Sequence, residues 1–487
     1  MINILIIIGA IGLIIQAFIG LSFLLSCISE KESRASMFAL IQFIGMLALL
    51  AGYLILALTG FFETKIGMTV LIAGYLLAGL ATFLLFRRSK PNPRALAGTK
   101  GMIIGDVKRF DERETVFART GSLRPGSEQY EAFYTEHPEY KAFDDARRAK
   151  GGPMGHVGAI DRPNGDVNVA MLMASSNLPF YLSDPDKVKP EPHFSLKKEL
   201  AEEKMTISPE EASERIKGYA KMLGAKLVGI TELNPLWIYS HRGRIFSDNW
   251  EDWGKEIPVE HQYAVVFAEE MSFDMIGPAP HTPTSIESMQ NYAKGAYIAV
   301  QVASFIANLG YSATANHFRY YEGLMVPMAV DAGLGELSRM GYLLTKDFGP
   351  RIRLSAVTTD IPLIPDKPVD IGAEDFCGFC KKCAVCCPSQ SIPMENQEEI
   401  NGTLRWKLNE QTCYEYWGKI GTDCNVCMRV CPWSHARTFP HKLIVAMITR
   451  NALSRRLFSI MDNIFYGKKP RSKDGPKWVR YKAPNPG

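Results

Sequence analysis

Three apolar segments open the chain and constrain its fold more than any other feature. They span residues 4–26, 37–62 and 66–86, and none of them contains Asp, Glu, Lys or Arg. Each is close to the ~20 residues that a helix needs to cross the hydrocarbon core of a bilayer. The sequence therefore predicts a three-helix membrane anchor over residues 1–86, with the lipid bilayer as a partner.

The charges that flank these segments predict their orientation. Arg87, Arg88 and Lys90 follow the third segment directly, whereas Lys65 is the one basic residue between the second and third segments. Positive charge is retained on the cytoplasmic side of membranes. We therefore expect a multi-pass protein of the cell inner membrane whose remaining residues are cytoplasmic. Because the segments contain no His, they cannot hold a bis-His haem, which favours an anchor over an electron carrier.

Nine of the ten cysteines lie between Cys377 and Cys431. The first run has the spacing C-x2-C-x2-C-x3-C-P of bacterial ferredoxins, in which three thiolates bind one 4Fe-4S cluster and the fourth binds another. A second run repeats the pattern with its first interval stretched to ten residues. The two runs predict a module with two 4Fe-4S clusters, and structural zinc explains this interleaving less well.

The pseudo-symmetry of the two runs predicts which cysteines hold each cluster. The predicted ligands are, for the first cluster, Cys377, Cys380, Cys383 and Cys431, and, for the second cluster, Cys387, Cys413, Cys424 and Cys427. Cys413 is the least certain of these because of the stretched interval. Cys386 is left over, and we interpret it as a small buried apolar residue near a cluster.

The region between the anchor and the cysteines is typical of a mixed α and β domain. A helix is predicted over residues 208–222 with Ser208 as its N-cap, strands over 225–230 and 263–268, and a helix over 288–309. A loop is predicted over residues 329–341. It contains Gly333-Leu-Gly335, two candidate cofactor-binding glycines, but lacks the third glycine of a dinucleotide-binding fingerprint.

Several motifs of this region occur together in one known family. They are Trp237-Ile-Tyr239-Ser240, Asn291-Tyr292, Phe305-Ile-Ala-Asn-Leu-Gly-Tyr311, Asp331-Ala-Gly-Leu-Gly-Glu336-Leu-Ser-Arg339, Phe348-Gly-Pro-Arg351-Ile-Arg353-Leu and Thr359-Asp-Ile-Pro-Leu-Ile-Pro-Asp-Lys-Pro368. In this combination the chain, over roughly residues 100–466, resembles the catalytic subunit of corrinoid-dependent reductive dehalogenases.

The resemblance implies a fold and a reaction. The expected fold is α+β, with a nitroreductase-like cobamide-binding core and a bacterial two-cluster ferredoxin-like module, preceded by three transmembrane helices. The expected domains are residues 1–86 (anchor), 87–369 (cobamide-binding catalytic domain), 370–440 (two-cluster module) and 441–487 (C-terminal helix and basic tail). The implied cofactors are a base-off cobamide and two 4Fe-4S clusters, which would replace halogen by hydrogen on an organohalide using electrons from an unidentified donor.

The chain departs from the respiratory members of that family. Those members carry a twin-arginine signal, act outside the cytoplasm and dock on a separate small membrane subunit. Here no such signal precedes the chain's three apolar segments, which are fused in place. The departure puts the respiratory role and the outside location in doubt.

The resemblance also assigns residues to the reaction. Tyr292 occupies the place of the family's proton donor, and Tyr297 is an alternative. A phenol donates a proton well only if a cation stabilises its anion, and Arg353, or else Arg351, is the candidate cation. Asn316 matches a polar active-site residue. An aromatic pocket for the substrate is predicted from Trp237, Tyr239, Trp250, Trp253, Tyr320 and Tyr321.

Two other functions remain open at this point. Epoxyqueuosine reductases combine cobalamin and two clusters, but they act on a tRNA base and would need a basic RNA-binding face and an Asp acid. A non-enzymatic iron-sulfur electron carrier would not need the long segment between the anchor and the cysteines. We therefore expect no nucleic-acid partner.

Overall fold

The chain forms two compact units. A computed structural model describes residues 2–151, 165–182, 200–245 and 250–480. One unit, the anchor unit, comprises Met1–Pro91 and His435–Arg471, and the other, the core unit, comprises Asn92–Ser434 and Ser472–Gly487. Each unit therefore joins an early part of the chain to a late one.

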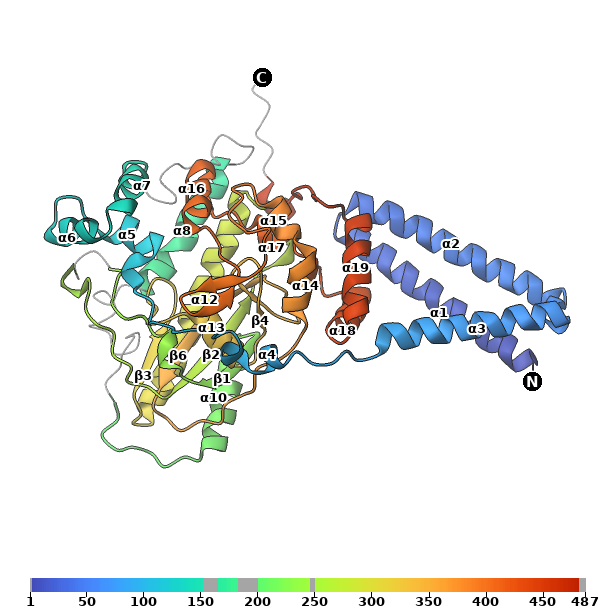
Figure 1. Cartoon of the computed structure of the whole chain (residues 1–487), viewed down its shortest axis with the longest axis horizontal. Coiled ribbons are helices and arrows are strands. Elements are labelled where there is room, and N and C mark those ends of the chain that lie inside the picture. Colours follow the sequence, from blue (N-terminus) through green and yellow to red (C-terminus); the bar gives the residue numbers. More distant parts are fainter. Residues whose placement is uncertain (1, 152–164, 183–199, 246–249, 481–487) are drawn as a thin grey trace, which may run out of the picture. The chain divides into compact units, whose positions relative to one another are not determined.

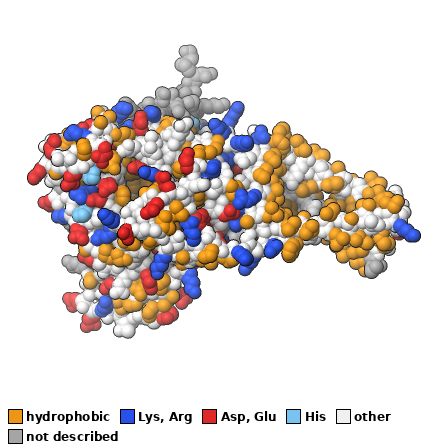
Figure 2. Space-filling model, viewed as in Figure 1, with side chains coloured by type: hydrophobic (Ala, Val, Ile, Leu, Met, Phe, Trp, Pro, Cys, Tyr) orange, Lys and Arg blue, Asp and Glu red, His pale blue; other side chains and the backbone are white. Residues whose placement is uncertain are grey.

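Three long helices dominate the anchor unit. They are α1 (Ile2–Ser29), α2 (Ser33–Leu58) and α3 (Lys65–Phe86), with the short 3-10 turn η1 (Phe61–Glu63) between the last two. All three are long and apolar enough to cross a membrane. Their surface is covered with hydrophobic side chains (Figure 2). The three expected spans are therefore present, and each is close to its predicted bounds.

Two shorter helices complete the anchor unit. They are α18 (Phe439–Ile448), which contacts α1, and α19 (Ala452–Phe465), which contacts α2 and α3. Asn451 caps α19 and donates to the backbone oxygen of Leu84 at the end of α3, at 2.9 Å. The side of α19 that is exposed carries a stripe of large apolar residues at helical spacing, namely Leu453, Leu457, Ile460 and Ile464.

The core unit is built on one four-stranded antiparallel sheet. Its strands are β1 (Leu227–Glu232), β2 (Tyr263–Glu270), β6 (Ile352–Thr359) and β3 (Ala313–Asn316), in that order. The register places Val265 opposite Val357, and it places Glu269 opposite Arg353. The predicted strands correspond to β1 and β2, and each continues two residues further than the sequence indicated.

Helices cover both faces of this sheet (Figure 1). Successive side chains of a strand point to opposite faces, so Val265 and Phe267 pack with α10 (Pro209–Leu223) and α12 (Thr282–Asn308). Ala264 and Val266 face the other way, toward α13 (Met325–Asp331). Ser208 caps α10 as predicted, by accepting a hydrogen bond from the amide of Glu211. α12 begins six residues before the predicted helix.

Further helices and two hairpins belong to the core unit, among them the short α11 (Phe273–Ile276) between β2 and α12. Before the sheet lie α4 (Pro93–Leu96), α5 (Val116–Ser122), α6 (Glu128–Glu136), α7 (Pro138–Ala149) and α8 (Gly165–Leu182). After it come α14 (Ala373–Cys380), α15 (Lys382–Cys386), α16 (Glu410–Ile420) and α17 (Val426–Val430), with the hairpins β4 (Glu336–Leu337) to β5 (Leu343–Leu344) and β7 (Glu398–Ile400) to β8 (Thr403–Arg405). The segment predicted as a loop over residues 329–341 thus contains the end of α13 and β4.

Candidate functional site

The two cysteine runs adopt the same local structure. In each run a Cys is followed by a non-glycine residue in the left-handed region, Lys381 at φ 55° and Asn425 at φ 51°. A five-residue helix then follows, α15 or α17, and it ends at a Cys-Pro pair. α15 and α17 contact each other. The pseudo-symmetry that was inferred from spacing is therefore also present in the backbone.

The cysteines gather into two groups. Electrostatic interactions connect Cys431 to Cys377, Cys380 and Cys383, although it lies far from them in sequence. In the other group Cys424 interacts with Cys413 and Cys387, and Cys427 interacts with all three and also with Cys383 of the first group. A small cavity is lined by this second group, that is by Cys387, Cys413, Cys424 and Cys427. These are the two sets of four that the sequence predicted as cluster ligands.

Cys386 is the remaining cysteine of the two runs. It ends α15, is partly exposed, and does not line the small cavity. Cys413 lies on α16, where it faces that cavity with Cys387. The ten residues between Cys413 and Cys424 thus form most of α16 and the turn after it. Because the chain turns there, Cys413 lies beside Cys424 and Cys427.

The motif from Asp331 to Arg339 holds the cluster module in place. Glu336 accepts hydrogen bonds from the amides of Ile371, Ala373 and Glu374, where α14 begins. Arg339 is fully buried and donates to the backbone oxygens of Cys377 and Gly378, at 2.9 and 3.3 Å. Buried charges of this kind are stable only when such partners satisfy them. The sequence marked this motif only through the resemblance, without indicating its role.

A large cavity opens beside the second cysteine group. Its volume is about 860 Å³, near the upper end of the range for small-molecule and cofactor sites. Its wall is mostly apolar and aromatic and includes Tyr292, Arg353 and Tyr342. Tyr342 and Leu408 line both this cavity and the small one between the cysteines. The two sites therefore share a wall.

Tyr292 and Arg353 meet in this cavity. Tyr292 comes from α12 and Arg353 from the start of β6, and the guanidinium carbon lies 5.2 Å from the centre of the phenol ring. The ring of Tyr292 also packs against the ring of Phe318, and the two ring centres are 4.5 Å apart. Tyr297, one and a half turns further along α12, is 47% exposed and does not line the cavity.

Two polar side chains, Ser288 and Asp423, hold the guanidinium of Arg353 in position. Its guanidinium donates to Ser288 at 2.8 Å and lies 3.5 Å from the carboxylate of Asp423. Asp423 also accepts from Ser288 and from Asn425. Burial works against the charge of Arg353, but Tyr292 and Asp423 raise its pKa above its usual value. The residue therefore stays a cation directed at the phenol.

Arg351 and Asn316 lie elsewhere. Arg351 is buried, donates to the backbone oxygens of Ser434 and Met271, and pairs with Glu270 at 3.4 Å. Asn316 is fully buried at the end of β3, where its amide oxygen accepts from the backbone of Glu322 at 2.7 Å. Neither residue lines the cavity. Their contacts are those of residues that fix the fold.

Gly333 and Gly335 each lie close to the backbone of another segment of the chain. Gly333 has a positive φ of 74°, and a Cβ added to it would lie 2.4 Å from the carbonyl oxygen of Lys367. A Cβ added to Gly335 would lie 2.2 Å from the carbonyl oxygen of Leu344. Both positions require glycine for close backbone packing, and neither glycine lines the cavity.

The predicted aromatic pocket forms in part. Trp237, Tyr239 and Tyr321 line the cavity. Trp253 packs against Phe133 instead, Tyr320 lies under Arg242, and the side chain of Trp250 is outside the described residues. Burial raises the pKa of Tyr321 and Tyr342 well above their usual range. These two phenols therefore keep their protons.

Known proteins resemble both parts of the site. The family of the 4Fe-4S dicluster domain matches residues 376–435. The tetrachloroethene reductive dehalogenase of Dehalobacter restrictus is 33% identical over 279 residues, 48% of this chain and 50% of the relative. The chain thus spans about half the length of this relative. The epoxyqueuosine reductase of Cyclobacterium marinum matches a shorter stretch, 35% identical over 122 residues and 23% of this chain.

A solved structure shows a similar fold. The catabolic reductive dehalogenase NpRdhA aligns with 79% of this chain and 49% of its own, with a TM-score of 0.57 and 24% identity. That enzyme has also been solved in complex with 3-bromo-4-hydroxybenzoic acid. Together the matches confirm the resemblance to the reductive dehalogenases and the predicted fold class, a mixed α and β core with a 4Fe-4S module after three helices that are long and apolar enough to cross a membrane.

Proposed function

We propose that the chain is a membrane-anchored reductive dehalogenase, which replaces a halogen of an organohalide by hydrogen. The observation that carries the proposal is the placement of Tyr292 and Arg353 in a large cavity that shares a wall with four cysteines. That arrangement brings a proton source, a space for cofactor and substrate, and an electron supply together. The similarity to tetrachloroethene reductive dehalogenases supports the same reaction.

The residues of the core unit fit the cofactors of such a reaction. Two groups of four cysteines supply the thiolates that two 4Fe-4S clusters need, Cys431 and its three partners for one and the four that line the small cavity for the other. The cavity of about 860 Å³ has the size and the apolar wall of a large cofactor site. A base-off cobamide bound there would supply a strongly reducing cobalt centre, and the clusters would supply electrons.

The chain itself supplies the proton and its control. Tyr292 donates its phenolic proton to the carbon that loses halide, and Arg353 stabilises the phenolate that forms. Ser288 and Asp423 hold the guanidinium in the position that this task requires. Tyr321 and Tyr342 retain their protons because burial raises their pKa values. Arg351 and Asn316, the other two candidates, support the fold around this pair.

The aromatic part of the wall suits an apolar halogenated substrate. Trp237, Tyr239 and Tyr321 present ring surfaces that exclude water and can stack on an alkene or an aromatic ring. Trp237 is oriented by a hydrogen bond from its indole nitrogen to Thr99 at 3.1 Å. We propose an organohalide as the substrate, and an electron donor that reaches the clusters from outside the chain.

We also propose that the core unit lies on the cytoplasmic side. α1 and α3 end, and α2 begins, on the side of the bundle that contacts α18 and α19. Arg87, Arg88 and Lys90 follow α3 on this side, and positive charge is retained in the cytoplasm. The apolar stripe of α19 would rest in the membrane surface there.

The proposal is tested on the full chain, purified without oxygen in lipid nanodiscs. We expect about eight iron atoms and one cobalt per chain, and release of halide from tetrachloroethene or a bromophenol with reduced methyl viologen as the electron source. A protein with iron but no cobalt and no halide release would instead be an electron carrier. Turnover of an epoxyqueuosine-containing tRNA stem loop, without halide release, would favour the epoxyqueuosine reductases.

A further inference from the structure

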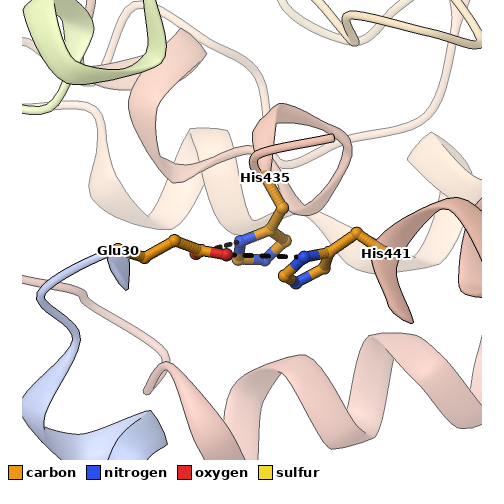
Figure 3. A group of neighbouring side chains, drawn as sticks. All are labelled: Glu30, His435 and His441. Atoms are coloured by element: carbon orange, nitrogen blue, oxygen red, sulfur yellow. Dashed lines mark ion pairs between the residues drawn. The ribbon is translucent and has the colours of Figure 1, made fainter. Parts of the chain in front are cut away.

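A compact group of ionisable side chains in the anchor unit takes no part in the proposed reaction. Glu30 follows directly after α1, His435 follows the last cluster cysteine, and His441 lies on α18. In Figure 3 the carboxylate of Glu30 points at both imidazole rings. Glu30 is 4% and His441 6% exposed. All three residues belong to the anchor unit.

The spacing of the three side chains is that of a metal site. One carboxylate oxygen of Glu30 lies 3.5 Å from Nδ1 of His435, and the other lies 3.4 Å from Nδ1 of His441. One ligand atom from each of the three residues lies within 4.8 Å of the other two. Two ligands that each lie about 2.1 Å from a tetrahedral ion are about 3.4 Å apart. The two gaps between Glu30 and the imidazoles, one from each carboxylate oxygen, are therefore as long as one edge of such a coordination shell.

The far side of each imidazole is held by a hydrogen bond. Nε2 of His435 lies 2.8 Å from the carboxylate of Asp462, and Nε2 of His441 lies 3.1 Å from the hydroxyl of Tyr466. Histidines that bind metals usually donate their other ring N–H to a carboxylate or another oxygen, which fixes the tautomer and the ring direction. Here both rings are held in this way at Nε2. Nδ1 of His435 is turned toward Glu30, and Nδ1 of His441 lies 3.4 Å from Glu30 and 2.8 Å from the hydroxyl of Thr438, which a bound ion would displace from Nδ1.

We propose that Glu30, His435 and His441 bind one divalent first-row transition-metal ion, Zn²⁺ or Fe²⁺. Two imidazoles and one carboxylate are ligands that both ions accept. The hydroxyls of Ser26 and Thr438, 2.8 Å apart, lie next to Glu30 and His441 and complete the polar surroundings.

The ion would connect distant parts of the chain. Glu30 and His435 are about 400 residues apart in sequence, so the bound ion closes a very long loop whose two ends lie in the anchor unit. It would fix the end of α1 to the segment that leads into α18. Because binding occurs only in the folded unit, the ion would also stabilise it in proportion to its affinity.

The test uses the full chain in nanodiscs, loaded with its clusters and treated with a chelator. Zn²⁺ and, in a separate experiment, Fe²⁺ are titrated without oxygen, and bound metal is counted by mass spectrometry. We expect one ion per chain beyond the cluster iron and the cobalt, and a higher unfolding temperature after loading. Glu30→Gln should abolish the extra ion, and Asp462→Asn, which leaves all ligands present, should weaken its binding by about 10- to 100-fold.

Glu32→Gln is the matched control, since it makes the same change two residues away and outside the group. This variant should bind the ion as the wild type does. If the wild type binds no extra ion at micromolar Zn²⁺ or Fe²⁺, the side chains form a hydrogen-bonded ion-pair network and the proposal is wrong. Equal binding by the wild type, Glu30→Gln and Asp462→Asn would place the ion elsewhere and would overturn it as well.

Discussion

Removal of the phenolic proton of Tyr292 should slow dehalogenation while leaving the cofactors bound. Tyr292→Phe keeps the ring, its contact with Phe318 at 4.5 Å between ring centres, and the shape of the cavity. General acid catalysis contributes about 10²- to 10⁴-fold to a rate. We therefore expect turnover with reduced methyl viologen to fall by that factor, with cobalt and iron content unchanged.

The contribution of Arg353 follows from its distance. At about 5 Å and an effective dielectric constant of about 20, a cation stabilises a neighbouring anion by about 3 kcal/mol. The guanidinium carbon lies 5.2 Å from the ring centre of Tyr292, so Arg353→Gln should cost about 10²-fold in rate. Because Arg353 would act on the phenolate, the variant with both changes should be no slower than Tyr292→Phe alone.

The control is Tyr297→Phe, the same substitution on the exposed side of the same helix. Turnover of this variant should equal that of the wild type. The reasoning is refuted if Tyr292→Phe turns over at the wild-type rate with its cofactors bound, because the proton would then come from water. It is also refuted if the losses in the double variant simply multiply, because Arg353 would then act independently of the phenol.

Three further predictions concern the clusters, the topology and the stability of the core unit. Cys413→Ala should remove the electron paramagnetic resonance signal of one cluster, whereas Cys386→Ala should leave both signals, since Cys386 is partly exposed and does not line the small cavity with the second cysteine group. Alkaline phosphatase fused after the last residue should be inactive, and a fluorescent protein that folds in the cytoplasm should be bright; the reverse pattern would contradict the orientation. Burial raises the pKa of Glu269 from 4.5 to about 8, so the folded state holds a proton that the unfolded state releases. The core unit should therefore lose stability as the pH rises from about 4.5 to about 8, by up to about 5 kcal/mol, and the unfolding temperature of Glu269→Gln should depend on pH less than that of the wild type.

Local patterns in the sequence predicted the three long apolar helices and the two sets of four cysteines that the fold brings together. A helix that crosses a bilayer must be apolar along about 20 residues, and this requirement is visible in composition alone. The ligands of a 4Fe-4S cluster come mostly from one short run, so the spacing of the cysteines from Cys377 to Cys387 already predicts their geometry. Even the position of Cys413, beside Cys387, Cys424 and Cys427, could be predicted across its stretched interval because the two runs repeat one another.

Only the tertiary structure distinguished between the candidates for the cation. Arg351 and Arg353 are two positions apart in one motif, and no periodicity separates them. Arg353 lies on β6 beneath α12, where it faces Tyr292, whereas Arg351 precedes the strand and donates to the backbone at Met271 and Ser434. The choice depends on how a strand and a helix from different parts of the chain pack, which no local pattern specifies.

The same reason explains why the group at Glu30 could not be foreseen. In the sequence Glu30 is an acid at the end of an apolar segment, and His435 and His441, with five residues between them, have a spacing that metal ligands can have but that does not indicate Glu30 as their partner. Chain folding brings the end of α1 to α18 and places the two imidazoles against one carboxylate. Spacing in sequence can predict a site only when one short segment supplies its ligands. A site assembled from residues about 400 positions apart exists only in the folded protein.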